Sequence, residues 1–198
     1  RIRFMGEEVV LNNPSQALRL GVGFIPDDRR NEGLTITQSV SRNMALPSLH
    51  LRQLAGFIQP GKEKQIVEEL IRSFDIKVAS RSQPAVSMSG GNQQRVVIAK
   101  WLTAEMDILI FDEPTRGIDV GAKQEIYHLL NELAAEGKSI VMISSELPEI
   151  LRMSHRILVM CEGRLTGELT AEEADQEKIM TLATQRESVA EVKDLMRA

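Results

Sequence analysis

Residues 108–114, Ile-Leu-Ile-Phe-Asp-Glu-Pro, decide the fold of this chain. The apolar run 108–111 is short and continuous, which is typical of a strand buried on both faces. The run ends in two adjacent carboxylates, Asp112 and Glu113, followed by Pro114, which stops a strand. Carboxylates are rarely buried without a partner, so packing explains this pair poorly. The stretch therefore predicts a buried strand with two acids at its carboxyl end.

Strands and helices are predicted to alternate around this strand. The expected elements are helices over about 92–102, 122–135, 147–153 and 172–183, and strands over 139–143, 156–160 and 164–169. Such alternation with tight links indicates a parallel sheet covered by helices. Ligands of such folds bind at the carboxyl ends of the strands, which is where Asp112 and Glu113 stand.

The first half of the chain is less regular. Residues 1–25 are predicted to be strand-rich, with two short strands about a turn at Gly6 and a buried strand at 22–25. Amphipathic or short helices are expected at about 39–46 and 62–74. The opening strand pair has no leading element to pair with, which predicts that the chain is a fragment of a longer domain.

Composition places the chain among ordinary globular proteins. Of its 198 residues, 42% are hydrophobic and 26% charged, which argues against low complexity and bulk disorder. The 24 basic and 28 acidic residues give a net charge of −4, which does not suggest a nucleic-acid binder. Cys161 is the only cysteine, which excludes an internal disulfide and a cysteine-based zinc cluster. No apolar stretch is long enough to span a bilayer.

The two acids predict a division of labour in phosphoryl chemistry. A strand alternates its faces, so Asp112 and Glu113 should point in different directions. Asp112 would hold Mg²⁺ and its waters, and Glu113 would orient or deprotonate an attacking water. A pair of solvated loop acids is an equally good interpretation of Asp-Glu taken alone.

A second pattern opens the helix expected after residue 91. Ser89 is a good N-cap, and Gly90 and Gly91 would let a phosphate approach the backbone closely. The free amides and the positive end of the helix dipole favour an anion there. For Ser-Gly-Gly by itself, an ordinary capped helix after a loop is the better interpretation.

Three motifs in order resemble those of an ABC-type ATPase. Ser89-Gly90-Gly91-Asn92-Gln93 is similar to the family's signature motif, with Asn92 where Gln is common. Residues 108–113 are similar to the Walker B strand, and Gly117-Ile118-Asp119 to the D-loop. The resemblance covers the chain from residue 1 to about residue 183.

Longer stretches resemble one subgroup of that family. They are similar to the second nucleotide-binding half of monosaccharide importers of the ribose, galactose and xylose type. The stretches that carry this likeness are Phe24–Arg29, Ser89–Gln94, Asp112–Lys123 and Ser144–Glu149. In that subgroup two ATPase halves are fused in one polypeptide, which works with a membrane permease and a periplasmic sugar-binding protein.

The chain also departs from the family pattern. No Gly-x-x-x-x-Gly-Lys-Ser/Thr motif occurs in it, and the family places that phosphate loop before the residue at which this chain starts. Ser145 stands where the family's switch histidine usually lies, and a serine does not titrate near neutral pH. Asp27 falls at the position of the Q-loop glutamine. These departures favour a half that does not hydrolyse ATP in its own site.

The resemblance implies an α/β fold with a P-loop NTPase-type parallel sheet core and a helical subdomain, incomplete at the N-terminus. Residues 1–183 would form a partial ABC ATPase domain, followed by a C-terminal tail at 184–198. The helical subdomain would span about 27–100, and the signature, Walker B, D-loop and switch region would span 87–160.

The resemblance also implies the roles of the site residues. ATP lies between the phosphate loop of one half and the signature of the other, so Ser89, Gly90 and Gly91 would contact ATP held by a partner half. Asn92, Gln93, Asp119 and Ser145 are further expected nucleotide contacts. Asp112 is the expected Mg²⁺ ligand and Glu113 the catalytic residue, both facing the nucleotide of this half's own site.

The function that this resemblance implies is energy coupling in a sugar importer. The implied partners are the other nucleotide-binding half, an integral membrane permease and, indirectly, a periplasmic sugar-binding protein, and the expected location is the cytoplasmic face of the inner membrane. Two alternatives stay open: a non-hydrolysing regulatory or decayed half, and a soluble ABC ATPase of DNA repair or translation. The 198-residue piece alone is expected to hydrolyse ATP negligibly.

Overall fold

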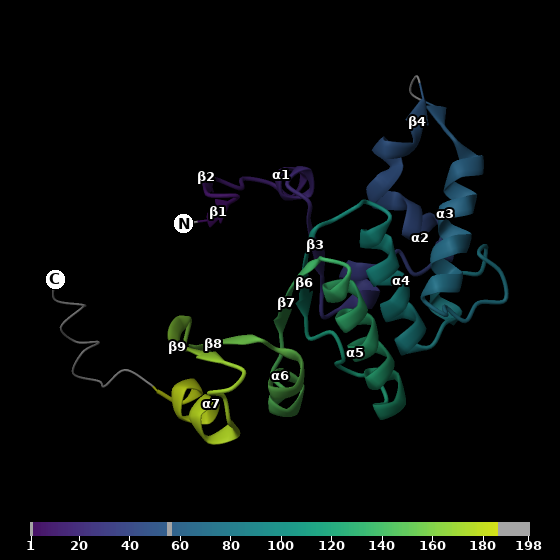
Figure 1. Cartoon of the computed structure of the whole chain (residues 1–198). Helices are drawn as coiled ribbons and strands as arrows, with labels where there is room; N and C mark the ends of the chain where they lie inside the picture. The colour runs from purple at the N-terminus through teal and green to yellow at the C-terminus, as the bar shows by residue number, and fades with distance from the viewer. Residues whose placement is uncertain (1, 55–56, 186–198) are drawn as a thin grey trace. The chain divides into compact units, whose positions relative to one another are not determined.

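The computed structural model describes residues 2–54 and 57–185 of the chain (Figure 1). The chain divides into two compact units, Arg1–Ile143 and Ser144–Ala198, which are described separately below. Within the described residues, no helix combines the length and the apolar composition that crossing a membrane requires. The tail expected at 184–198 lies outside the described residues, apart from its first two.

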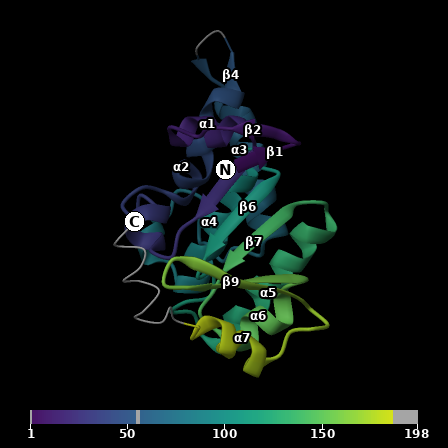
Figure 2. The same ribbon diagram turned by 90° about the vertical axis from the view of Figure 1, so that its left-hand side faces the viewer.

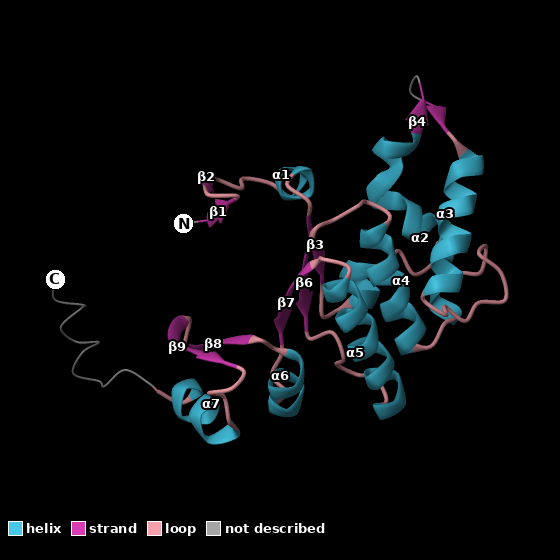
Figure 3. Ribbon diagram, viewed as in Figure 1, coloured by secondary structure: helices cyan, strands magenta, loops and turns pink. Residues whose placement is uncertain are grey.

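The first unit mixes short strands with helices of several lengths (Figure 3). In chain order its elements are β1 (Ile2–Phe4), β2 (Glu7–Val9), α1 (Pro14–Arg19), β3 (Val22–Ile25), η1 (Arg29–Gly33), α2 (Val40–Ala45), η2 (Leu46–Arg52), β4 (Gln53–Leu54), β5 (Phe57–Ile58), α3 (Pro60–Ser73), η3 (Ala85–Ser87), α4 (Gly90–Leu102), β6 (Ile108–Asp112), α5 (Val120–Ala135) and β7 (Ser139–Ile143).

A three-stranded parallel sheet forms the centre of this unit. Its strand order is β3-β6-β7, so the strand at 108–112 lies between the strands at 22–25 and 139–143. Ile25, Leu109 and Phe111 are fully buried, and they share one face because their registers match. Helix α4 contacts β3 and helix α5 contacts β7. Figure 2 looks onto the sheet with these helices behind it. The strands expected in this region are confirmed.

The loops that matter for function follow the carboxyl ends of these strands. Strands β3 and β6 run parallel and in register, so the segments after Ile25 and Asp112 leave the sheet at the same edge. The N–H of Glu113 donates to the carbonyl of Ile143 at 2.8 Å, which extends the pairing of β6 and β7 by one residue. This edge is called the carboxyl edge below.

A helical region lies between β3 and β6 in the sequence. Helix α2 packs against α3 and α4, and the side chains of Val40, Met44 and Val67 at these contacts are fully buried. Two hydroxyls inside the region are paired: Thr103 Oγ1 donates to the Met44 carbonyl at 2.7 Å, and Ser48 Oγ donates to Thr103 Oγ1 at 3.0 Å. Buried polar groups normally have such partners. The bounds 27–100 of the helical subdomain stay a prediction.

The N-terminal segment differs in one respect from the sequence expectation. Strands β1 and β2 pair antiparallel about the expected turn, but residues 14–19 form helix α1 instead of continuing the strand-rich pattern. Asn13 is its N-cap, with its side chain accepting from the N–H of Gln16, and Pro14 is its first residue. Asn followed by Pro is a known helix-start signal. Helix α1 was not among the expected elements, whereas the two short strands and the strand at 22–25 are present.

The second unit consists of α6 (Leu147–Met153), β8 (Arg156–Cys161), β9 (Arg164–Thr170) and α7 (Gln176–Ala183). Its core centres on Ile157, Val159 and Ile179. Strand β8 pairs antiparallel with β9 through the turn at 162–163. Counting this strand with the parallel series was therefore wrong, because its hydrogen-bond partner is the strand that follows it.

Candidate functional site

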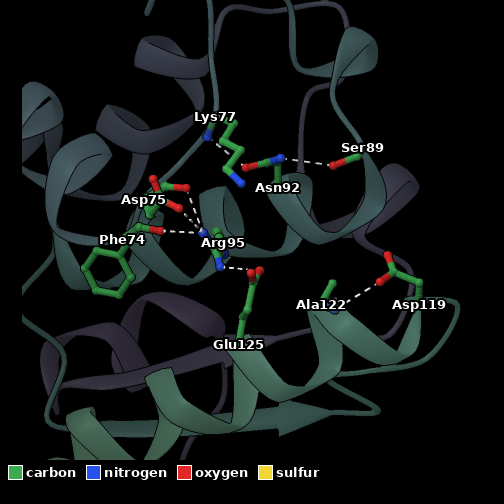
Figure 4. A network of polar contacts seen from close by, with 9 residues as sticks. All are labelled: Phe74, Asp75, Lys77, Ser89, Asn92, Arg95, Asp119, Ala122 and Glu125. Atoms are coloured by element: carbon green, nitrogen blue, oxygen red, sulfur yellow. Dashed lines mark hydrogen bonds and ion pairs between the residues drawn. The ribbon is translucent and has the colours of Figure 1, made fainter.

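The N-terminal end of α4 presents the predicted signature residues. Ser89 occupies the N-cap position with an extended backbone, φ −63° and ψ 157°, but its side chain makes no capping hydrogen bond. Its Oγ instead accepts from Asn92 Nδ2 at 3.0 Å, and Asn92 Oδ1 accepts from the N–H of Lys77 at 2.9 Å (Figure 4). Ser89 is exposed. The first amides of this helix are therefore left without a side-chain cap, which suits an external anion.

The two glycines allow close packing around that end. A Cβ atom on Gly91 would lie 3.1 Å from the Cβ of Ala122 in α5. A Cβ atom on Gly90 would lie 2.7 Å from Nη2 of Arg29. Gly91 thus has an intramolecular reason to lack a side chain, and a side chain at Gly90 would require the Arg29 guanidinium to shift.

Helix α5 begins beside α4. Asp119 is its N-cap, and Asp119 Oδ1 accepts from the N–H of Ala122 at 3.0 Å (Figure 4). The approach of Gly91 to Ala122 places the first turns of both helices next to each other. Both ends carry the positive pole of a helix dipole, so together they favour negative charge at this place. Asp119 supplies some of that charge as a cap.

The two predicted acids lie where β6 ends. Asp112 is the last residue of β6, and Glu113 follows it with φ +47°; both are half-buried. A non-glycine residue in this left-handed region costs about 1–3 kcal/mol, and such residues gather at functional sites and turns. Met5, Asp75 and Glu105 share a positive φ, so the backbone angle alone does not mark Glu113 as catalytic. Its place at the carboxyl edge is the stronger observation.

Mg²⁺ is the metal expected at Asp112. Across residues 2–54 and 57–185, no group of three or more His, Cys, Asp and Glu side chains is placed to hold a metal ion. Mg²⁺ is usually held by one or two carboxylates together with waters and substrate phosphates. A single half-buried carboxylate at a strand end, Asp112, fits that mode of binding.

The loops after β3 and β6 are joined by an ion pair. Arg116 Nη1 donates to Asp27 Oδ2. The structure thus gives the Arg116 side chain an intramolecular partner at the residue expected in the Q-loop position. The carboxylate of Asp27 is therefore engaged within the chain.

Gln93 differs from the other signature residues. Its side chain is fully buried, and its Nε2 donates to the carbonyl of Ala85 at 3.0 Å. This contact anchors α4 to the η3 turn. The expected contact between Gln93 and nucleotide stays a prediction, and the arrangement shown is a structural one.

Ser145 belongs to the second unit. It is exposed, and it lies in a turn in which the N–H of Glu146 donates to Ser144 Oγ at 3.0 Å. Ser144 Oγ also donates to Glu149 Oε2 at 2.5 Å. A groove in the same unit contains none of the predicted site residues. Its lining residues are Leu169, Asp175, Glu177, Lys178, Thr181 and Leu182.

Arg95 is a buried charged residue that the sequence motifs do not single out. Its side chain is 10% exposed and joins three helices (Figure 4). Arg95 Nη1 donates to the carbonyls of Phe74 and Asp75 at 3.0 and 2.7 Å, and Nη2 donates to Glu125 Oε2 at 2.5 Å. The available signal was a charge directly before the buried run 96–99 in α4.

Replacing Arg95 with Met should therefore destabilise the first unit. We expect Arg95→Met to lower the free energy of unfolding by about 2–3 kcal/mol, because two backbone carbonyls and Glu125 lose a charged donor. Urea unfolding followed by circular dichroism measures the change. Arg72→Met, at an exposed position of α3, is the matched control and should have little effect. Equal unfolding midpoints for the two variants would contradict the assigned role of Arg95.

Comparison with known proteins gives the family. A family model described as ABC transporter matches residues 1–116. The chain is 56% identical over 188 residues to a putative ribose/galactose/methyl galactoside import ATP-binding protein 3 of Burkholderia ambifaria, covering 94% of this chain and 37% of that protein. It is 52% identical over 179 residues to the ribose import ATP-binding protein RbsA of Bacillus subtilis, covering 90% of this chain and 36% of that protein.

Solved structures agree with the fold. The dimeric structure of an ATP-binding cassette in a post-hydrolysis state, bound to ADP and Pi, superposes with a TM-score of 0.67 at 21% identity, covering 81% of this chain and 68% of that one. The structure of cbiO1 from Clostridium perfringens, part of an ABC transporter complex, gives 0.72 at 23% identity, covering 100% and 76%. The predicted ABC ATPase fold class is thereby confirmed.

The chain spans little more than a third of the length of these two curated relatives. The family match covers more than half of the chain, and the identity to these relatives extends across nine tenths of it or more. The chain belongs to the ABC transporter family.

Proposed function

We propose that this chain is part of the ATP-binding subunit of a sugar importer, in which Ser89, Gly90 and Gly91 complete an ATP site held by a partner ATPase half. The 52–56% identity to proteins named for ribose or galactose import supports the substrate class. The ABC transporter family itself implies a nucleotide ligand. The geometry at the N-terminal end of α4 supports this end of the helix as the part of the chain that contacts the nucleotide.

The observation that carries the proposal is the juxtaposition at the carboxyl edge. The first turns of α4 and α5 touch through Gly91 and Ala122, and α4 begins without a side-chain cap. Two helix dipoles and a set of free amides favour a polyanion such as the triphosphate of ATP. The exposed Ser89 hydroxyl adds a donor at the same end.

The remaining residues divide between ligand contact and support. Asn92 holds the Ser89 hydroxyl, and Gln93 anchors the helix that carries it. Asp119 fixes the start of α5. Ser145, in the second unit, remains an expected nucleotide contact.

Asp112 and Glu113 would act on the nucleotide of this half's own site. Asp112 would hold Mg²⁺, which neutralises charge on the phosphates. Glu113 would orient an attacking water and accept its proton through the side-chain carboxylate. The backbone of Glu113 is in the left-handed region and its N–H donates to the carbonyl of Ile143. These two features fix the position from which the Glu113 side chain extends.

Energy coupling follows from these contacts. ATP binding would close the two halves over the nucleotide, and hydrolysis would reopen them. A membrane permease would convert the movement into transport, with a periplasmic sugar-binding protein delivering the sugar. The subunit would lie at the cytoplasmic face of the inner membrane, attached to the permease.

A second candidate function is a regulatory half that completes its partner's site without hydrolysing ATP in its own. The observation that favours it is the Arg116–Asp27 ion pair, which occupies the carboxylate at the Q-loop position. Ser145 at the switch position points in the same direction, because a serine does not titrate near neutral pH.

Reconstituted transport tests the proposal. The full-length protein that contains residues 1–198 would be co-expressed with its candidate permease and placed in vesicles with the sugar-binding protein. We expect the permease to co-purify and ribose or galactose uptake to require ATP. Absence of both co-purification and ATP-dependent uptake across a panel of pentoses and hexoses would overturn the importer assignment and favour a soluble ABC ATPase.

A further inference from the structure

Arg29 reaches across the carboxyl edge from the loop after β3 to the loop after β6. Its Nη1 donates to the carbonyl of Arg116 at 3.1 Å, and its Nη2 lies 3.5 Å from the carbonyl of Gly117. Gly117 has φ +66°, so these carbonyls belong to the turn that leads into α5. One guanidinium therefore faces two consecutive carbonyls of that turn.

The same guanidinium also lies against the start of α4. A Cβ atom on Gly90 would stand 2.7 Å from Arg29 Nη2, closer than real Cβ atoms approach. The carbonyl of Gly117 would be 3.7 Å from that Cβ. Arg29 thus lies between the first residue of α4 and the turn before α5, and a side chain at position 90 would require its guanidinium to shift.

Arg29 is half-buried, and its guanidinium is engaged by the backbone of the neighbouring turn. Its Nε is buried and has no hydrogen-bond partner. Burial lowers the pKa of Arg29, although an arginine keeps its charge in proteins. The loop that carries it is itself fixed, because Asp28 Oδ1 accepts from the N–H groups of Arg30 and Asn31 at 3.1 and 3.0 Å.

A second arginine, Arg116, links the same two loops, but it extends from the loop after β6 to the loop after β3. Arg116 sits in the turn that Arg29 holds, and its guanidinium pairs with Asp27, two residues before Arg29. The two loops are thereby joined twice, once through backbone carbonyls and once through a carboxylate. A double connection restricts the relative movement of the loops more than either bond alone.

We propose that Arg29 is a positioning residue that fixes the Arg116–Gly117 turn against Gly90, and so sets the spacing between the amides of Ser89–Gly91 and the start of α5. Arg29 touches no ligand in this account and acts through the two segments it joins. The functional consequence rests on the proposed function, because ATP is the ligand that this spacing would serve.

The geometry makes the guanidinium hard to replace. A lysine has one terminal nitrogen and lacks the planar fork that can face two carbonyls together. Arg29→Lys should therefore retain the charge and lose most of the positioning, and Arg29→Ala should lose both. Arg30→Ala is the matched control, since Arg30 is the exposed neighbour in the same loop.

The first test needs no nucleotide. Amide hydrogen exchange would be measured on the full-length protein without ATP, for peptides covering 113–119 and 96–102. We expect Arg29→Ala to speed exchange in 113–119 by about 10-fold, as the loss of one or two net hydrogen bonds implies. Exchange in 96–102, in the buried part of α4, should stay unchanged, and Arg30→Ala should match the wild type in both peptides.

The second test measures ATP turnover and ATP binding in the same variants. Turnover of Arg29→Ala should fall by about 10-fold or more, because small displacements of positioning groups cost that much in rate. The Kd for ATP in the open state should not change, because the spacing matters when the halves close. Millimolar methylguanidinium should restore part of the turnover of Arg29→Ala and leave Arg30→Ala unaffected.

The outcomes separate this inference from the proposed function. Unchanged exchange in 113–119 overturns the positioning role whatever the turnover. Faster exchange with wild-type turnover also overturns it, because the spacing would then serve no reaction. If exchange rises and the wild-type protein neither binds nor hydrolyses ATP, the structural role of Arg29 is supported and the proposed function fails.

Discussion

Ser89→Arg in the full-length protein is expected to lower ATP turnover by about 10²-fold or more, the scale found when a preorganised donor to a reacting oxyanion is lost. The arginine side chain would occupy the space in front of the first amides of α4, where the proposal places the terminal phosphate. Steady-state ATP hydrolysis by the reconstituted transporter measures the effect. The loss should appear with ATP still bound at the partner half.

The fold should tolerate this substitution. Ser89 is exposed and makes no capping hydrogen bond, so little cap energy is lost. A positive charge at a helix N-terminus costs only about 0.3–1 kcal/mol. Ser82→Arg, at another exposed serine before α4, adds the same charge and should leave turnover unchanged. Equal turnover in the two variants would contradict a contact between Ser89 and nucleotide.

Glu113→Gln tests whether this half hydrolyses ATP itself. We expect turnover to fall by about 10²-fold or more, the range for loss of a general base. The side-chain amide of glutamine has almost the size and shape of the carboxylate. The hydrogen bond from the backbone N–H of residue 113 to the carbonyl of Ile143 is kept. ATP binding should therefore persist. Single-turnover hydrolysis separates the chemical step from binding.

The matched control for that variant is Glu105→Gln. Glu105 also has a positive φ, +58°, and it is exposed in the turn after α4, away from the carboxyl edge. The Glu105→Gln variant should hydrolyse ATP at the wild-type rate. If Glu113→Gln does so as well while Ser89→Arg is inactive, the regulatory half described above replaces the catalytic one.

The central sheet could be predicted from the sequence because its signals are local. The apolar run 108–111 and the stretches at 22–25 and 139–143 all form strands close to their expected bounds. Helix α5 begins two residues earlier than expected, at Val120, because Asp119 caps it. A cap in front of an apolar-periodic segment is a signal that the sequence contains and that the helix expectation did not use.

Strand pairing was less predictable. Strand β8 has the composition of a buried strand, yet it pairs antiparallel with β9. Its alternation of buried and exposed residues is what a two-stranded ribbon with one buried face requires. The partner of a strand depends on tertiary structure, which a short apolar run does not reveal.

Some residues of the candidate site could be predicted from the sequence, and others could not. The acids Asp112 and Glu113 and the turn at Ser89 could be found from motifs, since their order along the chain is a local pattern. Arg29 and Arg95 could not, because their partners lie 87 and 30 residues away in the sequence. Both are arginines whose role becomes visible only when distant loops and helices meet.

The most direct measurement of the central claim is a structure of the intact protein, with both ATPase halves, bound to a non-hydrolysable ATP analogue and Mg²⁺. The account predicts the Ser89 hydroxyl and the amides of Gly90 and Gly91 within hydrogen-bond distance of the terminal phosphate of the analogue held by the partner half. A structure with both halves closed over the analogue, and with this turn facing solvent away from the phosphates, would contradict it.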